Sequence, residues 1–338
     1  MRIFLFILSK IYALLMRLRA FLYRRGIFKT YQSSLKVISI GNVTAGGTGK
    51  TPHCIYLVQL LSNLGYKPVV LSRGYKGCYR GVYQVEVDDG VDVCGDEPLL
   101  IRRKTNQPVI LARNRVQGVR YIESNKLGNI IILDDGLQHL RLRRDLEIVL
   151  INVGDSSAIR DILDNRVLPF GLLREDRHMA IERADLCILS HRKPLIDSND
   201  ADPAIVNLIP NDKTLISSFF EADGLFSYTS QEKLTAPATV VAFCAIANAQ
   251  AFFSTLQSLG YDIHDTISRR DHYNFSHSDI ELMKKKYPDM PLVCTEKDAV
   301  RLTGSDFPSV YVLKGSTVIK EHSIFLSTIE KTLEGIKI

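Results

Sequence analysis

Short runs of apolar and β-branched residues alternate along the chain with longer segments whose apolar residues recur at helical spacing. The short runs predict buried or extended strands, and the longer segments predict helices. Strands are expected over residues 37–40, 67–72, 81–87, 109–111, 129–133, 146–152, 184–190, 215–220, 239–244, 262–267, 292–295 and 310–313. Helices are expected over residues 2–25, 52–64, 99–104, 116–126, 249–259 and 276–286. This alternation indicates an α/β fold built on a parallel sheet.

A stretch rich in Pro, Asp and Asn over residues 193–213 divides the pattern into two parts. We therefore expect an amphipathic helix over residues 1–28, a larger α/β domain over 29–210, and a smaller α/β domain over 211–338. A chain of 338 residues is long enough for two such cores. The six cysteines form no C-x-x-C pair, which argues against a zinc site or a disulfide framework and for a reduced, intracellular protein.

A glycine-rich turn, GNVTAGGTGKTP, joins the first predicted strand to the helix that follows it. Strand, Gly-rich turn, Gly-Lys-Thr and helix in this order are typical of the P-loop, whose backbone N–H groups and helix dipole hold phosphate oxygens. We expect Lys50 to reach the β- and γ-phosphates and the Thr51 hydroxyl to lie on Mg²⁺. Thr44 stands where the usual P-loop pattern has its first glycine. The alternative to a phosphate-binding loop is a Gly-rich turn that arises by chance. The predicted phosphate-binding residues are Thr44, Ala45, Gly46, Gly47, Thr48, Gly49, Lys50 and Thr51.

Two adjacent carboxylates, Asp134 and Asp135, follow the predicted strand over residues 129–133. P-loop proteins use an Asp at the end of a neighbouring strand to orient Mg²⁺ and its water ligands, because that strand end lies beside the phosphate loop. We therefore expect one or both of these carboxylates to form a Mg²⁺ site with Thr51. The sequence leaves open which of the two contacts the metal.

The net charge of +6 is unevenly distributed. The first 85 residues contain 13 lysines and arginines and no Asp or Glu, so an anionic partner is expected for this part of the chain. Residues 2–25 combine these basic residues with many apolar ones, and no uncharged run reaches the length of about 20 residues that spans a bilayer. We expect an interfacial helix on an anionic membrane. A signal peptide and a helix packed on the protein's own core are the alternatives.

Several other polar residues are candidates for binding or chemistry. Arg73 and Arg115 follow predicted strands, and open α/β sheets bind ligands at the carboxyl ends of their strands. Arg174, in a Pro/Gly-rich loop, is a candidate phosphate-binding cation, with a salt bridge to its acidic neighbours as the alternative. His272 is a candidate proton acceptor near neutral pH, although a lone histidine is more often structural. Asp96, with the glutamate that follows it, either caps a helix or takes part in chemistry.

Taken in order, these motifs resemble the tetraacyldisaccharide 4′-kinases, the ATP-dependent lipid A 4′-kinases of Gram-negative lipopolysaccharide synthesis. The shared motifs are GNVTAGGTGKTP, LSRGYKG, GDEP, ARNR, LDDGLQH, PFGLLRE, DHY and TEKD. The first of these together with LDDGLQH is specific, whereas GDEP and Asp-His alone are not. The resemblance extends to about residue 315, and Ala245 and Ala247 depart from it because they stand where the family has glycines.

The resemblance implies an ATP- and Mg²⁺-dependent kinase that acts on the 4′-hydroxyl of a tetraacylated glucosamine disaccharide 1-phosphate. It implies that Asp96 and His272 together deprotonate the sugar hydroxyl, which requires the second domain to close over the first. Lys50 and Arg174 are expected to hold phosphates and to neutralise charge on the transferred phosphoryl group. Substrate contacts are expected from Arg73, Tyr75, Arg115, Gln138 and His139.

An enzyme of this kind is expected on the cytoplasmic face of the inner membrane, with the acylated disaccharide and the anionic membrane surface as partners. No nucleic acid and no obligate protein partner are expected, since the basic residues lie among Leu, Ile and Phe. The rival interpretation is a membrane-associated P-loop ATPase that acts as a nucleotide switch. A switch needs no base for an alcohol, so Asp96 and His272 favour the kinase.

Overall fold

The computed structural model describes residues 1–46, 49–191, 202–302 and 307–336. Its strands are β1 (Lys36–Asn42), β2 (Pro68–Ser72), β3 (Val82–Gln84), β4 (Val109–Ala112), β5 (Ile130–Asp134), β6 (Leu146–Asn152), β7 (Leu186–His191), β8 (Thr214–Ser227), β9 (Lys233–Leu234), β10 (Thr239–Cys244), β11 (Asp262–Ser268), β12 (Leu292–Thr295) and β13 (Val310–Ile319). Its helices are α1 (Arg2–Arg24), α2 (Lys50–Asn63), α3 (Val91–Cys94), α4 (Asp96–Thr105), α5 (Arg115–Ser124), α6 (Ser156–Leu163), α7 (Arg177–Arg183), α8 (Pro203–Val206), α9 (Ala249–Ser258), α10 (His277–Lys286), α11 (Glu296–Ala299) and α12 (His322–Leu333).

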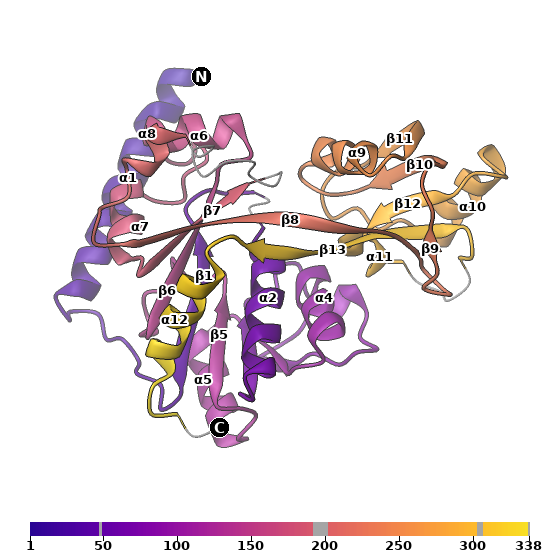
Figure 1. Cartoon of the computed structure of the whole chain (residues 1–338). Helices are drawn as coiled ribbons and strands as arrows, with labels where there is room; N and C mark the ends of the chain where they lie inside the picture. The colour runs from indigo at the N-terminus through magenta and orange to yellow at the C-terminus, as the bar shows by residue number, and fades with distance from the viewer. Residues whose placement is uncertain (47–48, 192–201, 303–306, 337–338) are drawn as a thin grey trace.

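One continuous sheet runs through both halves of the molecule (Figure 1). Its strand order is β11-β10-β12-β13-β8-β7-β6-β1-β5-β2-β4-β3, with β9 paired to β8. Neighbouring strands are parallel except at β13–β8, β8–β9 and β3–β4. The α/β fold on a mainly parallel sheet that the sequence predicts is therefore confirmed, and so is the N-terminal helix.

In the first domain, helices cover both faces of the sheet. The core on one face joins the central strands to α2, α4 and α12. On the other face, α5 packs over β2 and β4, while α6, α7 and α8 pack beside β6 and β7. The middle strands are buried on both faces because they lie between these two helical layers. This explains their nearly unbroken apolar sequences, such as Ile130–Asp134, which is buried throughout.

The second domain repeats this layered arrangement on a smaller scale. Strand β10 alternates its side chains between two cores, with Val241 and Phe243 facing α10 and Val240 and Ala242 facing α9. Helix α10 begins with a capping box formed by Ser276 and Asp279, and Ser276 is the N-cap that the sequence predicts.

The two domains are joined by two long strands, β8 and β13, which run side by side from one domain to the other (Figure 1). Strand β8 starts parallel to β7 and then continues antiparallel to β13. After β13, the chain returns to the first domain. There α12 buries Phe325, Ile329 and Leu333 in the same core as α2. The C-terminal helix therefore holds the strand pair to the P-loop domain.

Replacing Ile329 with Ala is expected to lower the free energy of unfolding by about 2–5 kcal/mol, because the side chain is fully buried and its removal leaves a cavity. Urea denaturation followed by circular dichroism measures the change. The matched control is Ile324→Ala on the same helix, where the side chain is 48% exposed and the expected change is below about 0.5 kcal/mol. Equal effects of the two substitutions would mean that α12 is not docked in this core.

Candidate active site

The P-loop follows β1, which lies between β5 and β6 in the middle of the first domain's sheet. Helix α2 begins at Lys50, and Gly49 is its N-cap with a φ of 79°, a conformation that favours glycine. Gly46 also has a positive φ, of 104°, and is exposed. Thr44 is buried and forms a β-bridge with Leu173, so this non-glycine position is part of the loop's support. Gly47 and Thr48 lie outside the described residues.

A buried histidine connects this loop to the strand pair that leads to the second domain. His53 Nδ1 lies 2.7 Å from the Gly49 carbonyl oxygen, and His53 Nε2 lies 2.8 Å from the Ser218 hydroxyl on β8. Burial lowers the pKa of His53 to about 4, so the ring is neutral at physiological pH. A neutral ring donates through Nδ1 to the carbonyl and accepts from the hydroxyl through Nε2.

Lys50, Asp135 and Arg174 form a network beside the P-loop. Lys50 Nζ lies 3.2 Å from Asn42 Oδ1 and 3.7 Å from Asp135 Oδ1. Arg174 Nη1 donates to both oxygens of Asp135, at 2.7 and 2.9 Å. Burial raises the pKa of Asp135, but Lys50 and Arg174 outweigh it and the net shift is downward. The alternative partners of Arg174 are otherwise engaged, since Glu175 pairs with Arg183 and Asp176 with Arg17.

Asp134 lies in a different environment and fits a metal ligand better than Asp135 does. It is buried at the end of β5, and its Oδ2 accepts a hydrogen bond of 2.8 Å from the Ser72 hydroxyl. Burial, followed by the charges of Glu97 and Asp135, raises its pKa to about 6. A bound cation would offset these unfavourable effects on the ionised carboxylate. Mg²⁺ is commonly held by one or two protein oxygens together with substrate phosphates, and Asp134 with Thr51 would offer such oxygens. No group of three or more His, Cys, Asp or Glu in the described part of the chain forms a metal cage.

The loop that carries Arg174 is attached to the P-loop on one side. The Ala45 N–H donates to the Leu172 carbonyl at 2.7 Å, and the Arg174 N–H donates to the Val43 carbonyl at 2.9 Å. These backbone bonds continue the Thr44–Leu173 bridge, so Arg174 is held in register with the phosphate loop.

On its other side, the same loop is attached to α1. The buried Ser9 hydroxyl donates to the Val167 carbonyl at 2.7 Å, and the Tyr12 hydroxyl donates to the Arg174 carbonyl at 2.9 Å. The Phe6 and Phe170 rings meet edge to face with centroids 5.5 Å apart. The N-terminal helix is therefore part of the support of Arg174.

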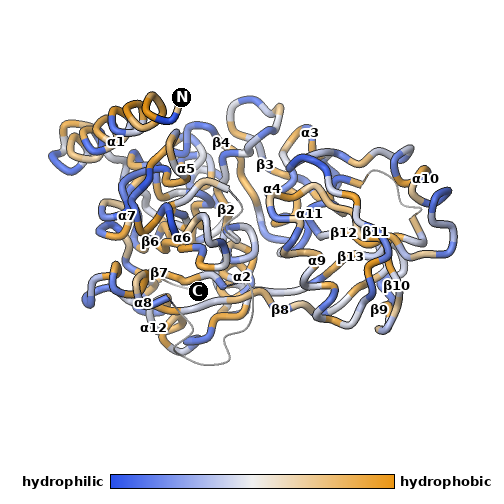
Figure 2. Tube along the Cα trace, turned by 90° about the horizontal axis from the view of Figure 1, so that it is seen from above, coloured by the Kyte–Doolittle hydropathy of each residue, from blue (hydrophilic) through white to orange (hydrophobic). Residues whose placement is uncertain are grey.

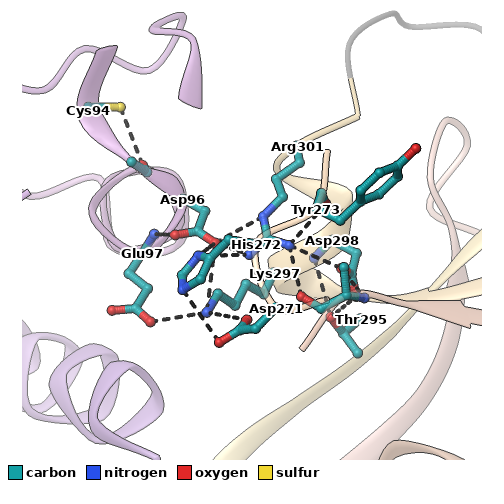
Figure 3. Close-up of polar contacts among 12 residues, drawn as sticks. Cys94, Asp96, Glu97, Asp271, His272, Tyr273, Thr295, Lys297, Asp298 and Arg301 are labelled. Carbon is teal, nitrogen blue, oxygen red and sulfur yellow. Dashed lines mark hydrogen bonds and ion pairs between the residues drawn. The ribbon is translucent and has the colours of Figure 1, made fainter. Parts of the chain in front are cut away.

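Across the domain boundary, Asp96 and His272 are in direct contact (Figure 3). Asp96 is the first residue of α4 in the first domain, and His272 lies in the turn after β11 in the second. Asp96 Oδ2 lies 2.9 Å from His272 Nδ1. The Tyr75 ring lies edge-on to the imidazole, with centroids 5.8 Å apart. This contact is the arrangement that the Asp–His pair implied by the family resemblance requires, while its role in proton transfer stays a prediction.

Cations of the second domain surround the same carboxylate. Lys297 Nζ lies 3.2 Å from Glu97 Oε1, 3.5 Å from Asp271 Oδ1 and 3.7 Å from Asp96 Oδ2. The buried Arg301 also donates to Asp96. Burial raises the pKa of Asp96, but Lys297, Arg301 and His272 outweigh it, so the pKa lies below its ordinary value. Asp96 is therefore ionised at physiological pH.

The remaining predicted substrate contacts lie in two places. Arg73 and Tyr75 are both exposed in the turn after β2, and the Tyr75 ring lies against His272. The Arg73 carbonyl accepts from the Tyr79 hydroxyl. Arg115 is buried, and its guanidinium donates to the backbone carbonyls of Ala112 and Asp134, so it supports the strand ends from inside.

Gln138 and His139 lie on the α1 side of the site. Gln138 Nε2 donates to Glu175 Oε1 at 3.0 Å, and the Gln138 carbonyl accepts from Arg19 of α1 at 3.1 Å. Burial, followed by the charges of Arg115 and Arg144, lowers the pKa of His139 to about 4. His139 is therefore a neutral group beside a cluster of cations.

Sequence reasoning gave no role to several residues of this site. The sequence predicts for Glu97 only a role beside Asp96 in capping a helix. In the structure its carboxylate pairs with Lys297, and its charge raises the pKa of Asp134. Lys297 stands in the TEKD motif, and Arg301 follows it four residues later, which is the spacing of one helical face.

A P-loop with an adjacent pair of carboxylates, in a chain that also brings an Asp and a His into contact, is typical of P-loop phosphotransferases. The family model for tetraacyldisaccharide-1-P 4′-kinase (LpxK) matches residues 1–334, and the chain belongs to this family. It is accordingly a kinase.

Individual relatives agree with this assignment. A tetraacyldisaccharide 4′-kinase of Psychromonas ingrahamii is 35% identical over 87% of this chain and 84% of its own length. One of Syntrophotalea carbinolica is 37% identical over 90% of this chain and 84% of its own. The crystal structure of LpxK from Aquifex aeolicus in complex with ATP matches with a TM-score of 0.78 and 27% identity, and covers 98% of this chain and 99% of that one.

Replacing Asp134 with Asn is expected to raise the thermal midpoint at neutral pH. A buried carboxyl whose folded pKa is about 6 destabilises the fold when it ionises, so the advantage of Asn, about 3 kcal/mol, is present above pH 6 and is lost as the pH falls below about 4. Differential scanning fluorimetry between pH 4 and pH 8 measures the midpoint.

The same pair of proteins tests the metal site without an activity assay. In the presence of ADP, exchanging EDTA for Mg²⁺ is expected to raise the midpoint of the unsubstituted protein more than that of Asp134→Asn. Equal Mg²⁺ responses would exclude Asp134 as a ligand.

Proposed function

We propose that this chain transfers the γ-phosphate of ATP to the 4′-hydroxyl of a tetraacylated glucosamine disaccharide 1-phosphate, in lipid A synthesis. Two groups of residues support the proposal, and Glu97 links them, because its charge raises the pKa of Asp134 and its carboxylate pairs with Lys297 beside Asp96. The P-loop, Asp135 and Arg174 suit a nucleotide, while Asp96 and His272 suit an alcohol that must lose its proton. Family membership supplies the class of acceptor.

In this proposal each residue has one task. Lys50 and the loop from Thr44 to Thr51 hold the phosphates, and Arg174 neutralises charge that develops on the transferred group. Asp134 and Thr51 hold Mg²⁺, which supplies further neutralisation of the phosphate oxygens. The Asp96–His272 pair takes the proton of the hydroxyl. The hydroxyl oxygen then bonds to the γ-phosphorus as the bond to the bridging oxygen of ADP breaks.

Substrate recognition is assigned to side chains around the site. The Tyr75 ring lies against His272, Arg73 is exposed in the same turn, and Gln138 and His139 lie between the P-loop side and α1. A cavity beside His272 is lined by Lys76, Arg270, Asp271, Tyr273 and Asn274. Arg115 contributes indirectly in this scheme, by holding the ends of β4 and β5.

The position of the protein on a membrane is also a proposal. Helix α1 lies at the edge of the molecule and is rich in hydrophobic residues (Figure 2). Its exposed apolar residues are Ile3, Phe4, Phe6, Ile7, Leu8, Ile11, Leu14, Leu15, Leu18 and Phe21. Among the helices of the described ranges, none is both long enough and apolar enough to cross a bilayer. Such a helix, with basic residues and no acidic ones, suits the anionic cytoplasmic face of an inner membrane.

The function is tested by phosphate transfer. Purified protein with Mg²⁺ and γ-labelled ATP is expected to label a detergent-dispersed disaccharide lipid A precursor, and Lys50→Ala is expected to abolish the labelling because it removes the cation that holds the β- and γ-phosphates. Hydrolysis of ATP with no labelled lipid would favour the nucleotide switch instead.

In the same assay, His272→Ala separates chemistry from binding. It is expected to lower kcat for transfer by about 10²–10⁴-fold, the range for loss of a general base. The affinity for ATP, measured by isothermal titration, is expected to change less than threefold. Equal losses of transfer and of ATP affinity would mean that His272 is structural.

Membrane docking is tested by a triple substitution on the exposed face of α1, Ile7→Asn, Leu14→Asn and Leu18→Asn. This variant keeps Ser9 and Tyr12, so the contacts of α1 with the Arg174 loop remain. Binding to vesicles that contain anionic lipid is expected to weaken at least 100-fold, because each apolar side chain contributes about 1.5–3 kcal/mol when buried. Vesicle flotation measures the bound fraction.

The control carries the same number of Asn substitutions at exposed apolar positions outside α1, namely Val87, Leu282 and Ile324. It is expected to bind vesicles like the unsubstituted protein. Equal weakening in both variants, or tight binding by the α1 variant, would exclude the helix as the docking surface.

A further inference from the structure

Arg301 is a buried arginine whose guanidinium extends from the second domain to Asp96 in the first (Figure 3). It is 2% exposed and follows α11 directly. Its Nε donates to Asp96 Oδ2 at 2.9 Å, and its Nη2 donates to the same oxygen. The other terminal nitrogen, Nη1, donates to the Ala245 carbonyl at 3.0 Å. One side chain thus binds the carboxylate of one domain and the backbone of the other.

A second buried carboxylate, that of Asp298, also contacts the guanidinium of Arg301. Asp298 is fully buried, and its Oδ1 lies 3.4 Å from Arg301 Nη1. The same oxygen accepts from the Ala245 N–H at 2.9 Å, and Oδ2 accepts from the Thr295 hydroxyl at 2.6 Å. Because every group of this cluster is held by another, the guanidinium has a fixed orientation toward Asp96.

Both oxygens of Asp96 already accept hydrogen bonds within the protein, and most of these contacts are to Oδ2. Its Oδ1 accepts from the Glu97 N–H at 2.9 Å, and its Oδ2 accepts from Arg301 and lies 2.9 Å from His272 Nδ1. His272 Nδ1 has two polar neighbours, Asp96 Oδ2 at 2.9 Å and Arg301 Nη2 at 3.3 Å. The shorter contact is with the carboxylate, which only accepts hydrogen bonds, so we assign the proton to Nδ1 and the lone pair to Nε2. Nε2 points away from Asp96, 3.5 Å from Asp271 Oδ2. His272 lines the cavity that also contains Lys76.

We propose that Arg301 is the positioning residue of the Asp96–His272 pair: it occupies Asp96 so that His272 Nε2, and not the carboxylate, accepts the proton of the substrate hydroxyl. This inference rests on the proposed kinase function. In the step, the proton passes from the hydroxyl to Nε2 while the hydroxyl oxygen bonds to the γ-phosphorus. ADP leaves with the electron pair of the broken P–O bond. Asp96 stays ionised throughout, and the positive charges of Arg301 and Lys297 compensate its negative charge.

Arg301→Gln tests the role in transfer. It is expected to lower kcat by about 10–100-fold while the KM for ATP changes less than threefold, because the base loses its orientation but the P-loop is untouched. Arg301→Lys keeps the positive charge but cannot donate to Asp96 through two nitrogens, so it is expected to recover only part of the loss. The acidic limb of the kcat profile is expected to move to higher pH, because the base, His272, loses a positive charge that lies 3.3 Å from its Nδ1.

The matched control is Arg269→Gln, the same chemical change at an exposed arginine of the second domain. It is expected to leave kcat and the pH profile unchanged. Thermal melts accompany each variant, so that loss of folding is recognised. Unchanged kcat and pH profile in a folded Arg301→Gln protein, or a faster reaction, would overturn the proposal.

A second readout does not depend on the transferred phosphate. ¹⁵N-histidine NMR identifies which ring nitrogen carries the proton, and His272→Gln assigns the signal. The Nδ1–H form is expected in the unsubstituted protein, and a mixture of both forms in Arg301→Gln. An Nε2–H form in the unsubstituted protein would overturn the role of Arg301. If the Nδ1–H form depends on Arg301 but the protein transfers no phosphate to the lipid, the positioning role of Arg301 stands and the proposed acceptor is rejected.

Discussion

The charge of Asp96 is compensated almost entirely from across a domain boundary. Removing one partner of a buried ion pair typically costs about 3–5 kcal/mol, because the other charge is then stranded away from water. Here the partners are Arg301, Lys297 and His272, all from the second domain. The charge state of Asp96 and the placement of the second domain are therefore linked. The turn of His272 shares this constraint, since the residue has a φ of 67° and its N–H bonds to the Ala245 carbonyl that Arg301 also holds.

The strand pair that joins the domains makes a second connection between them. Strand β8 is 14 residues long, whereas the sequence pattern predicts only residues 215–220. Its first part lies beside β7 of the P-loop domain, and Ser218 bonds to His53 in the first turn of α2. Its last part belongs to the sheet of the second domain through β13. The phosphate loop and the second domain thus share one continuous piece of backbone.

Local signals allowed much of this arrangement to be predicted. The predicted strand over residues 146–152 is β6, and the Ser276 cap begins α10, because apolar runs and capping residues act over a few positions. Asp134 lies beside the P-loop because β5 pairs with β1 in parallel, a rule that needs only strand order.

Features that depend on distant partners could not be predicted in this way. Arg301 meets a carboxylate 205 residues earlier, and nothing near it in the sequence indicates that it is buried. Arg115 has the sequence context of a substrate contact but turns inward to backbone carbonyls, because the strand ends beside it need donors. The return of α12 to the first domain is of the same kind, since only the completed core offers a place for its apolar face.

Helix α1 has one face that packs on the protein and another that carries exposed apolar residues. This arrangement relates the height of the active site above any surface that α1 binds to the position of the helix. Its Ser9 and Tyr12 bind the loop of Arg174, and its 23 residues correspond to about 34 Å of length. A helix attached in this way cannot roll about its axis or slide along it without moving that loop. A surface that receives its apolar face therefore sets the elevation of Arg174 above it. In the proposed membrane docking, a lipid whose hydroxyl stands at that elevation would be reached first, so acyl-chain anchoring would itself be a means of selecting the substrate.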